Sequence, residues 1–163
     1  MQSRSVKRSG QKKGTNPYLF SLYIGFFAGL IWGGLKLVEY LLKFTKIVPG
    51  FLLNPFMKLS YLQTWQGLIV GWLSFIGFSV IAALLYGLTM RKMAGPWYGF
   101  GYGVFWWGIL YLLIGPFTGM VPAVMKVDAN TFFSDVCLFI LWGLFIGYSI
   151  SMEYTDERNR EPA

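Results

Sequence analysis

The chain has 163 residues, of which 55% are hydrophobic and 13% charged, and its mean hydropathy is +0.52. A soluble domain carries about a quarter charged residues, so this composition predicts an integral membrane protein. The sequence contains no histidine and a single cysteine, Cys137. These counts exclude an intramolecular disulfide, a histidine-based zinc site and any His-dependent catalytic triad or dyad.

Residues 1–16 form a basic segment with almost no apolar side chains, so we predict a disordered tail. Its cations are Arg4, Lys7, Arg8, Lys12 and Lys13. Near a membrane each is expected to gain about 1 kcal/mol from anionic lipid headgroups. No aromatic side chain lies among them to stack on bases, so no nucleic-acid partner is expected.

Four stretches of the chain are long and apolar enough to cross a membrane, which takes about 20 residues at ~1.5 Å per residue. They cover approximately residues 18–42, 65–88, 97–114 and 131–150. None shows the period-2 alternation of a membrane strand. The sequence therefore predicts an all-α integral membrane domain, residues 17–151, built as a bundle of four transmembrane helices. Residues 152–163 are expected to form a short cytoplasmic tail.

The distribution of Lys and Arg predicts the orientation of this bundle. With four spans, both termini and the turn at residues 89–95 share one side. The cations on that side are Arg4, Lys7, Arg8, Lys12, Lys13, Arg91, Lys92, Arg158 and Arg160. The opposite side holds fewer: Lys43, Lys46, Lys58 and Lys126. Because cytoplasmic loops carry the excess of Lys and Arg, both ends are predicted to be cytoplasmic (N-in/C-in), in the cell membrane.

Both loops on the external side are apolar. In residues 43–64, Asn54 followed by Pro55 is a helix-start signal, with Asn54 as the N-cap. We therefore expect a short interfacial helix over residues 55–62, lying on the outer leaflet. The loop of residues 115–130 is expected to lie against lipid or to dip into the bundle.

Glycines recur at four-residue spacing in every predicted span. They are Gly25, Gly29 and Gly33, then Gly67 and Gly71, Gly99 and Gly103, and Gly143 and Gly147. Small residues let membrane helices approach closely and associate through van der Waals contact. We interpret these faces as helix-packing sites, within the chain or against a partner or a second copy. The alternative is that the glycines line a pore or allow a transporter helix to bend.

Three charged residues lie within the predicted spans: Lys36, Glu39 and Asp135. Lys36 and Glu39 share a helix face and are expected to be able to pair. Lys36 and Asp135 lie at a similar depth, ~8–9 Å inside the external boundary at 1.5 Å per residue, which allows a bridge between the first and last spans. The cluster is a candidate ion or proton site, or a gate. Alternatively, Lys36 and Glu39 snorkel to the interface, and the helix dipole stabilises Asp135.

No catalytic, cofactor or metal site is expected. Asp135 is the only aspartate in a span, so a paired-aspartate protease is excluded, and Cys137 has no histidine to activate it and is expected to be a small packed residue. The glycines at 99–103 follow no strand and lie in an apolar span, which does not fit a nucleotide-binding loop. No acid continues across the membrane after Asp135 until Glu153, which argues against a proton pump.

Several segments resemble a family of small Bacillus-type membrane proteins known as YqhR. The matching segments are residues 43–49 (KFTKIVP), 54–56 (NPF), 97–103 (WYGFGYG), 128–131 (DANT) and 145–151 (FIGYSIS). The resemblance extends from the first span to Tyr154. It implies a four-span protein of the cytoplasmic membrane of Gram-positive, often spore-forming, bacteria, and it assigns no role to any residue.

From these observations we expect a non-enzymatic accessory, assembly or interaction component of the bacterial cell membrane. Its partners would be the lipid bilayer and a membrane protein or a second copy of the chain. The alternative is a small transporter or channel that uses the external cluster of Lys36, Glu39 and Asp135.

Overall fold

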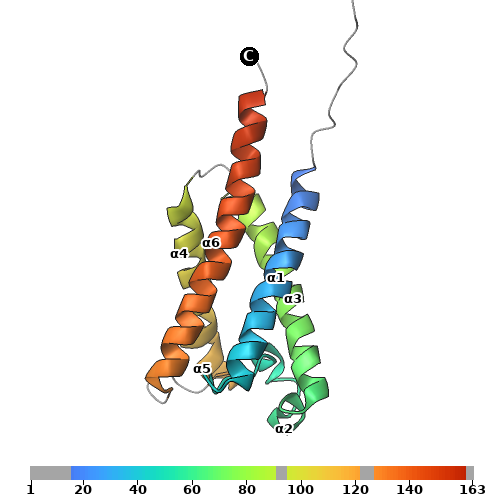
Figure 1. Ribbon diagram of the computed structural model, residues 1–163, viewed down its shortest axis with the longest axis vertical. Helices are drawn as coiled ribbons and strands as arrows, with labels where there is room; N and C mark the ends of the chain where they lie inside the picture. Colours follow the sequence, from blue (N-terminus) through green and yellow to red (C-terminus); the bar gives the residue numbers. More distant parts are fainter. Residues whose placement is uncertain (1–15, 91–94, 122–126, 161–163) are drawn as a thin grey trace, which may run out of the picture.

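The computed structural model describes residues 16–90, 95–121 and 127–160, and in these ranges every regular element is a helix (Figure 1). The long helices are α1 (Pro17–Leu41), α3 (Trp65–Thr89), α4 (Pro96–Gly108) and α6 (Ala129–Arg160). The short segments are the 3₁₀-helix η1 (Phe51–Leu53), α2 (Leu59–Leu62), the π-helix η2 (Ile109–Ile114) and α5 (Gly115–Thr118). The predicted basic tail falls almost wholly on residues 1–15, outside the described residues.

Within the described residues, four helical stretches are long and apolar enough to span a membrane: Tyr18–Leu41, Trp65–Thr89, Pro96–Thr118 and Ala129–Glu153. They confirm the predicted all-α bundle of four transmembrane helices. The third stretch runs through α4, η2 and α5, so it ends at Thr118 rather than at residue 114. Helix α6 continues to Arg160, where the sequence predicted a separate tail from residue 152.

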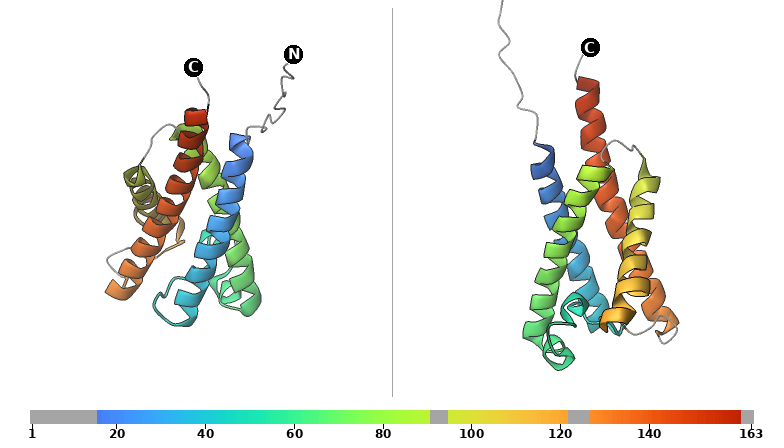
Figure 2. Two further views of the ribbon diagram at one scale, coloured as in Figure 1. Left: turned by 45° about the horizontal axis from the view of Figure 1, so that its top comes forward. Right: turned by 180° about the vertical axis from the view of Figure 1, so that it is seen from behind.

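Helix α1 begins and α6 ends at the same end of the bundle (Figures 1 and 2). The opposite end, which we call the loop end, carries the first long loop (residues 42–64) and a second long loop, described at residues 119–121 and 127–128. The first loop contains a short helix as expected, but it is only α2, and its N-cap is Lys58. Asn54 is not the N-cap of a helix but the residue that follows η1, where its N–H donates to Phe51 O (3.1 Å). Its Nδ2 donates instead to Gly119 O (3.4 Å) and Met120 O (3.1 Å), so a contact between loops replaces the local cap.

Helices α1 and α3 form one closely packed pair across the α1 glycines. A Cβ added at Gly25 would lie 2.7 Å from Val80 Cα, and one at Gly29 would lie 2.5 Å from Ile76 Cα. Real Cβ atoms essentially never approach other atoms closer than 3.0 Å. The backbones therefore meet at a distance that only glycine permits on α1.

Helices α4 and α6 form a second pair, in which glycines of both helices face each other. A Cβ at Gly99 would lie 2.8 Å from Gly143 O, and one at Gly143 would lie 2.6 Å from Gly99 O. A Cβ at Gly103 would likewise lie 3.0 Å from Ile140 Cα, and one at Gly147 would contact the backbone of Gly99. The predicted faces of these two spans thus pack against each other inside one chain.

The glycines of α3 have a different role from the one the sequence suggested. A Cβ at Gly67 would lie 2.6 Å from Leu62 Cα, and one at Gly71 would lie 3.0 Å from the carbonyl carbon of Pro49. These positions therefore accommodate the first long loop, folded back against α3, rather than another span.

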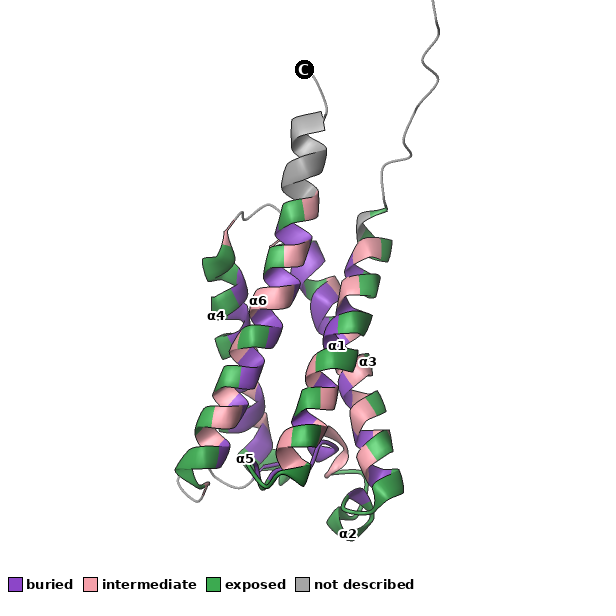
Figure 3. Ribbon diagram, in the orientation of Figure 1, coloured by how far each residue is buried: buried purple, intermediate pink, exposed green. Residues whose placement is uncertain are grey.

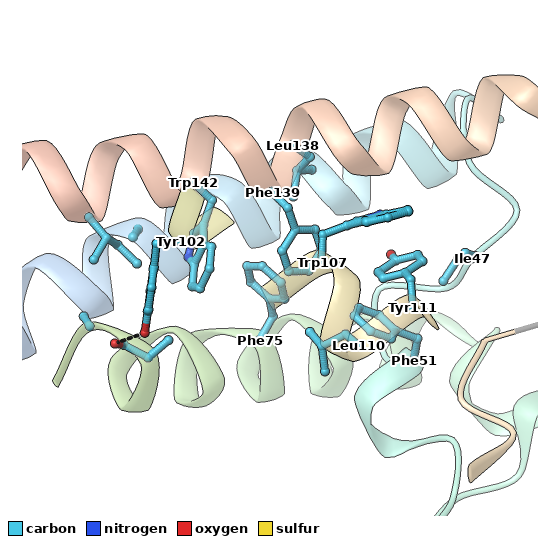
Figure 4. Close-up of a cluster of buried hydrophobic side chains, with 14 of the residues drawn as sticks. Ile47, Phe51, Phe75, Tyr102, Trp107, Leu110, Tyr111, Leu138, Phe139 and Trp142 are labelled. Atoms are coloured by element: carbon cyan, nitrogen blue, oxygen red, sulfur yellow. Dashed lines mark hydrogen bonds between the residues drawn. The ribbon is translucent and has the colours of Figure 1, made fainter. Parts of the chain in front are cut away.

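Aromatic side chains join the two pairs (Figure 4). Between α3 and α4 the rings of Phe78 and Trp106 lie 5.0 Å apart, and between α3 and α6 those of Phe75 and Phe139 lie 6.0 Å apart. Buried residues follow the inward sides of the long helices, while exposed residues cover the outward sides (Figure 3). The bundle is therefore two glycine-packed pairs held together by an aromatic core.

A π-helix interrupts the third span immediately before Pro116. Proline has no N–H to donate and its ring displaces the carbonyl of the preceding turn. Here the N–H of Gly115 donates to Leu110 O, which gives the wider π turn. Leu110 and Tyr111 in this segment are buried. π-helical turns occur frequently at functional sites.

Candidate functional site

Lys36 of α1 and Asp135 of α6 form an ion pair in which both side chains are 0% exposed. The pair joins the two glycine-packed helix pairs near the loop end. The structure thus brings together the two charges whose depths in the sequence allowed a bridge. Lys36 does not snorkel to the interface, as the alternative interpretation required, because its ammonium is enclosed by protein.

Side chains from two further segments complete the surroundings of this pair. The Lys36 ammonium also donates to Tyr111 OH (3.2 Å), and Thr45 Oγ1 lies 3.5 Å from Asp135 Oδ2. The ammonium lies 5.8 Å from the Phe51 ring centroid and 5.9 Å from that of Tyr111, within cation–π range. The site is therefore assembled from α1, the first long loop, η2 and α6.

Sequence reasoning missed Tyr111, Thr45 and Phe51. A signal existed for Tyr111, because Pro116 follows it in an otherwise helical stretch and predicts an irregular turn there. Thr45 and Phe51 lie in a loop, where no periodicity shows which side chains turn inward. Only the folded loop brings them to the ion pair.

A further set of contacts ties the first long loop to the beginning of α6. The N–H of Lys46 donates to Thr131 Oγ1 (3.2 Å), and the Lys46 ammonium forms an ion pair with Asp128 at the surface. The N–H of Ile47 donates to Thr45 Oγ1 (3.2 Å), which orients that hydroxyl. These contacts hold Thr45 in place beside Asp135.

The helix dipole does not account for Asp135. Helix α6 begins at Ala129, so Asp135 lies in its second turn, whereas the dipole acts mainly within the first. Asp135 is stabilised by Lys36 instead. Two charges of opposite sign in a dry interior need each other, because removing one leaves the other unpaired and buried.

Glu39 lies one turn further along α1 and is half-buried. Its Oε2 is buried and has no hydrogen-bond partner among the residues that the structure describes. The described part of the chain contains no ion pair between Glu39 and Lys36, which the shared helix face had allowed. The structure therefore pairs Lys36 with Asp135 and places Glu39 beside that pair.

The interior between the ion pair and the other end of the bundle is filled by rings. Tyr111 contacts Phe139 with ring centroids 5.8 Å apart, Phe139 contacts Trp142 at 5.8 Å, and Trp142 contacts Tyr102 at 6.2 Å (Figure 4). Two polar side chains in this region bond to protein: Trp142 Nε1 donates to Ser79 Oγ (2.8 Å), and Tyr102 OH donates to Ala82 O (2.6 Å). The phenylalanines separate these bonds from the ion pair.

The other residues singled out in the sequence lie in helix or loop contacts or on the outward side of α6. The packing glycines, namely Gly25, Gly29, Gly33, Gly67, Gly71, Gly99, Gly103, Gly143 and Gly147, are all buried by contacts within the chain. Cys137 was expected to be packed but is exposed, because it lies on the outward side of α6. Over the described ranges, no group of three or more acidic, Cys or His side chains is arranged to hold a metal ion.

Comparison with known proteins gives one family and one similar protein. The family model described as "Conserved membrane protein YqhR" matches residues 3–163. The "Uncharacterized protein YqhR" of Bacillus subtilis (strain 168) is 30% identical over 132 residues, which cover 81% of this chain and 74% of that protein. No solved structure matches the chain.

Proposed function

The chain belongs to the YqhR family of conserved membrane proteins, and we propose that it is a non-enzymatic component of the bacterial cell membrane that acts by binding another membrane-spanning chain. Both termini would be cytoplasmic, as the excess of Lys and Arg at that end suggests. The bound chain would be a partner protein or a second copy.

The observation that carries this proposal is the closed interior. The ion pair is buried on all sides, and aromatic rings fill the space between it and the other end. Lys36 and Asp135 bind each other, and Trp142 and Tyr102 bind Ser79 and Ala82. The outward helix sides are therefore the surfaces that we assign to the binding of another chain. The packing glycines are buried in contacts within the chain, so a partner would have to contact other positions.

Site-specific photo-cross-linking in native membranes tests the proposal. A photoreactive phenylalanine analogue is introduced at Leu141 of α6 or Ile81 of α3, whose side chains face outward, and at Phe139, which is fully buried. We expect adducts of higher mass from an outward position and none from Phe139. The proposal would be contradicted if outward positions on all four spans yielded no protein adduct and the protein were strictly monomeric.

A small transporter or channel is the second candidate, favoured by the buried charges. Ionisable residues inside a membrane are functional candidates by default, and Lys36 and Asp135 lie where the two helix pairs meet. Rocking of one such unit against the other is a common way to open a transporter. Asp135→Asn should then abolish flux in reconstituted vesicles while the protein remains folded, whereas an unfolded variant would favour a structural role.

A further inference from the structure

A pocket of about 410 Å³ opens between the two long loops at the loop end. The first loop contributes Lys46, Ile47, Val48, Asn54 and Leu59 to its lining; the other side contributes Pro116, Gly119, Met120 and Val121. The bonds from Asn54 Nδ2 to Gly119 O and Met120 O bridge the two sides. Its volume lies in the range of small-molecule sites, roughly 300–1,000 Å³.

The lining of the pocket combines an apolar interior with a cationic rim. Ile47, Val48 and Val121 are buried and form apolar walls. Lys46 is 77% exposed and carries the positive charge at the rim. Lys43 and Lys58 are also exposed at this end, whereas Asp128 is the exposed acid that the structure describes there. The exposed charge around the pocket is therefore positive.

The pocket lies just beyond the ends of the spans, because its lining comes from the two loops and from Pro116 at the end of the third span; the headgroup region borders the hydrocarbon core at this level. The two most exposed large apolar side chains in the described part of the chain are Phe117 (85%) and Phe56 (82%). Phe117 is adjacent to Pro116, and Phe56 lies two residues from Asn54. Exposed apolar surface costs free energy in water, so these rings favour contact of the loop end with the bilayer.

We propose that this pocket binds one anionic phospholipid from the leaflet at the loop end, with its phosphate on Lys46 and an acyl chain against Ile47, Val48 and Val121. The existing Lys46–Asp128 pair does not prevent this. Exposed ion pairs contribute little to stability, so a phosphate can replace the carboxylate. A zwitterionic lipid fits less well, since its own ammonium group would approach Lys46. The inference does not depend on which membrane function the chain performs.

Native mass spectrometry of the purified full-length protein in a neutral detergent tests the site. Phosphatidylglycerol and phosphatidylcholine with identical acyl chains are the probes. We expect one phosphatidylglycerol to remain bound at concentrations where phosphatidylcholine does not. Lys46→Gln should lower the affinity about fivefold, and Leu59→Trp, which narrows the pocket, should also lower it.

Two matched variants separate the site from general charge effects. Lys43→Gln removes an exposed lysine that does not line the pocket, and it should lower the affinity less than Lys46→Gln does. Asp128→Asn breaks the same ion pair as Lys46→Gln but frees the lysine, so it should raise the affinity by up to about fivefold. Equal retention of the two lipids, equal effects of Lys43→Gln and Lys46→Gln, or displacement of the lipid by inorganic phosphate alone would overturn the proposal.

Discussion

The buried ion pair makes a sharp prediction about stability. Asp135→Leu leaves the Lys36 ammonium unpaired in a dry interior, and Lys36→Met leaves the carboxylate in the same position. The double variant removes both charges and keeps apolar groups of similar size. The parent, the two single variants and the double variant therefore form a double-mutant cycle around one contact.

The magnitude follows from complete burial. Both side chains are 0% exposed, so solvent does not screen their attraction. Two unit charges about 4 Å apart attract by about 4 kcal/mol at an effective dielectric of 20. Each single substitution should lower the free energy of unfolding by about 3–5 kcal/mol. The double variant should lie within about 2 kcal/mol of the parent, since only Tyr111 and Thr45 lose a partner.

Reversible unfolding in mixed micelles, followed by tryptophan fluorescence, measures these free energies. Cys137→Ala is the matched control, because Cys137 lies two residues from Asp135 but faces outward, and it should change stability by less than about 0.5 kcal/mol. Losses that simply add in the double variant would refute the reasoning, as would a loss below about 1 kcal/mol for Asp135→Leu.

Further predictions concern the helix contacts and the exposed thiol. Gly103→Ala should destabilise the protein by about 1–3 kcal/mol in the same assay, because its Cβ would overlap the carbonyl oxygen of Phe139. Gly101→Ala meets no atom within 4 Å and should be neutral or stabilising by up to about 1 kcal/mol; equal losses would contradict the packing assignment. Tyr111→Phe keeps the ring but removes the bond to Lys36, and should cost about 1.5–3 kcal/mol; an unchanged midpoint would contradict it. Cys137 faces outward within a membrane span, where its thiol is not ionised, so it should react slowly with maleimide in membranes and rapidly after unfolding; rapid labelling before unfolding would show that the thiol reaches water.

Much of the architecture follows from local properties of the chain. The four spans depend on the length and hydropathy of each segment. These properties determine whether a segment is stable in lipid, independently of any contact with another helix. The common depth of Lys36 and Asp135 follows from a constant helical rise, so the two charges were expected at the same level. The break in the regular α-helix of the third span before Pro116 follows from the missing N–H of proline.

Only the tertiary structure decided which helix or loop each span packs against. The same glycine spacing serves three purposes: Gly25 faces α3, Gly99 faces α6, and Gly67 faces the first long loop. Asn54 carries a local capping signal, but its amide bonds the second loop. The site residues Tyr111 and Thr45 come from segments that periodicity does not describe. The rotation of each helix about its axis and the path of each loop depend on contacts between residues that are distant in sequence. Local patterns of hydrophobic and small residues do not show which of these contacts form.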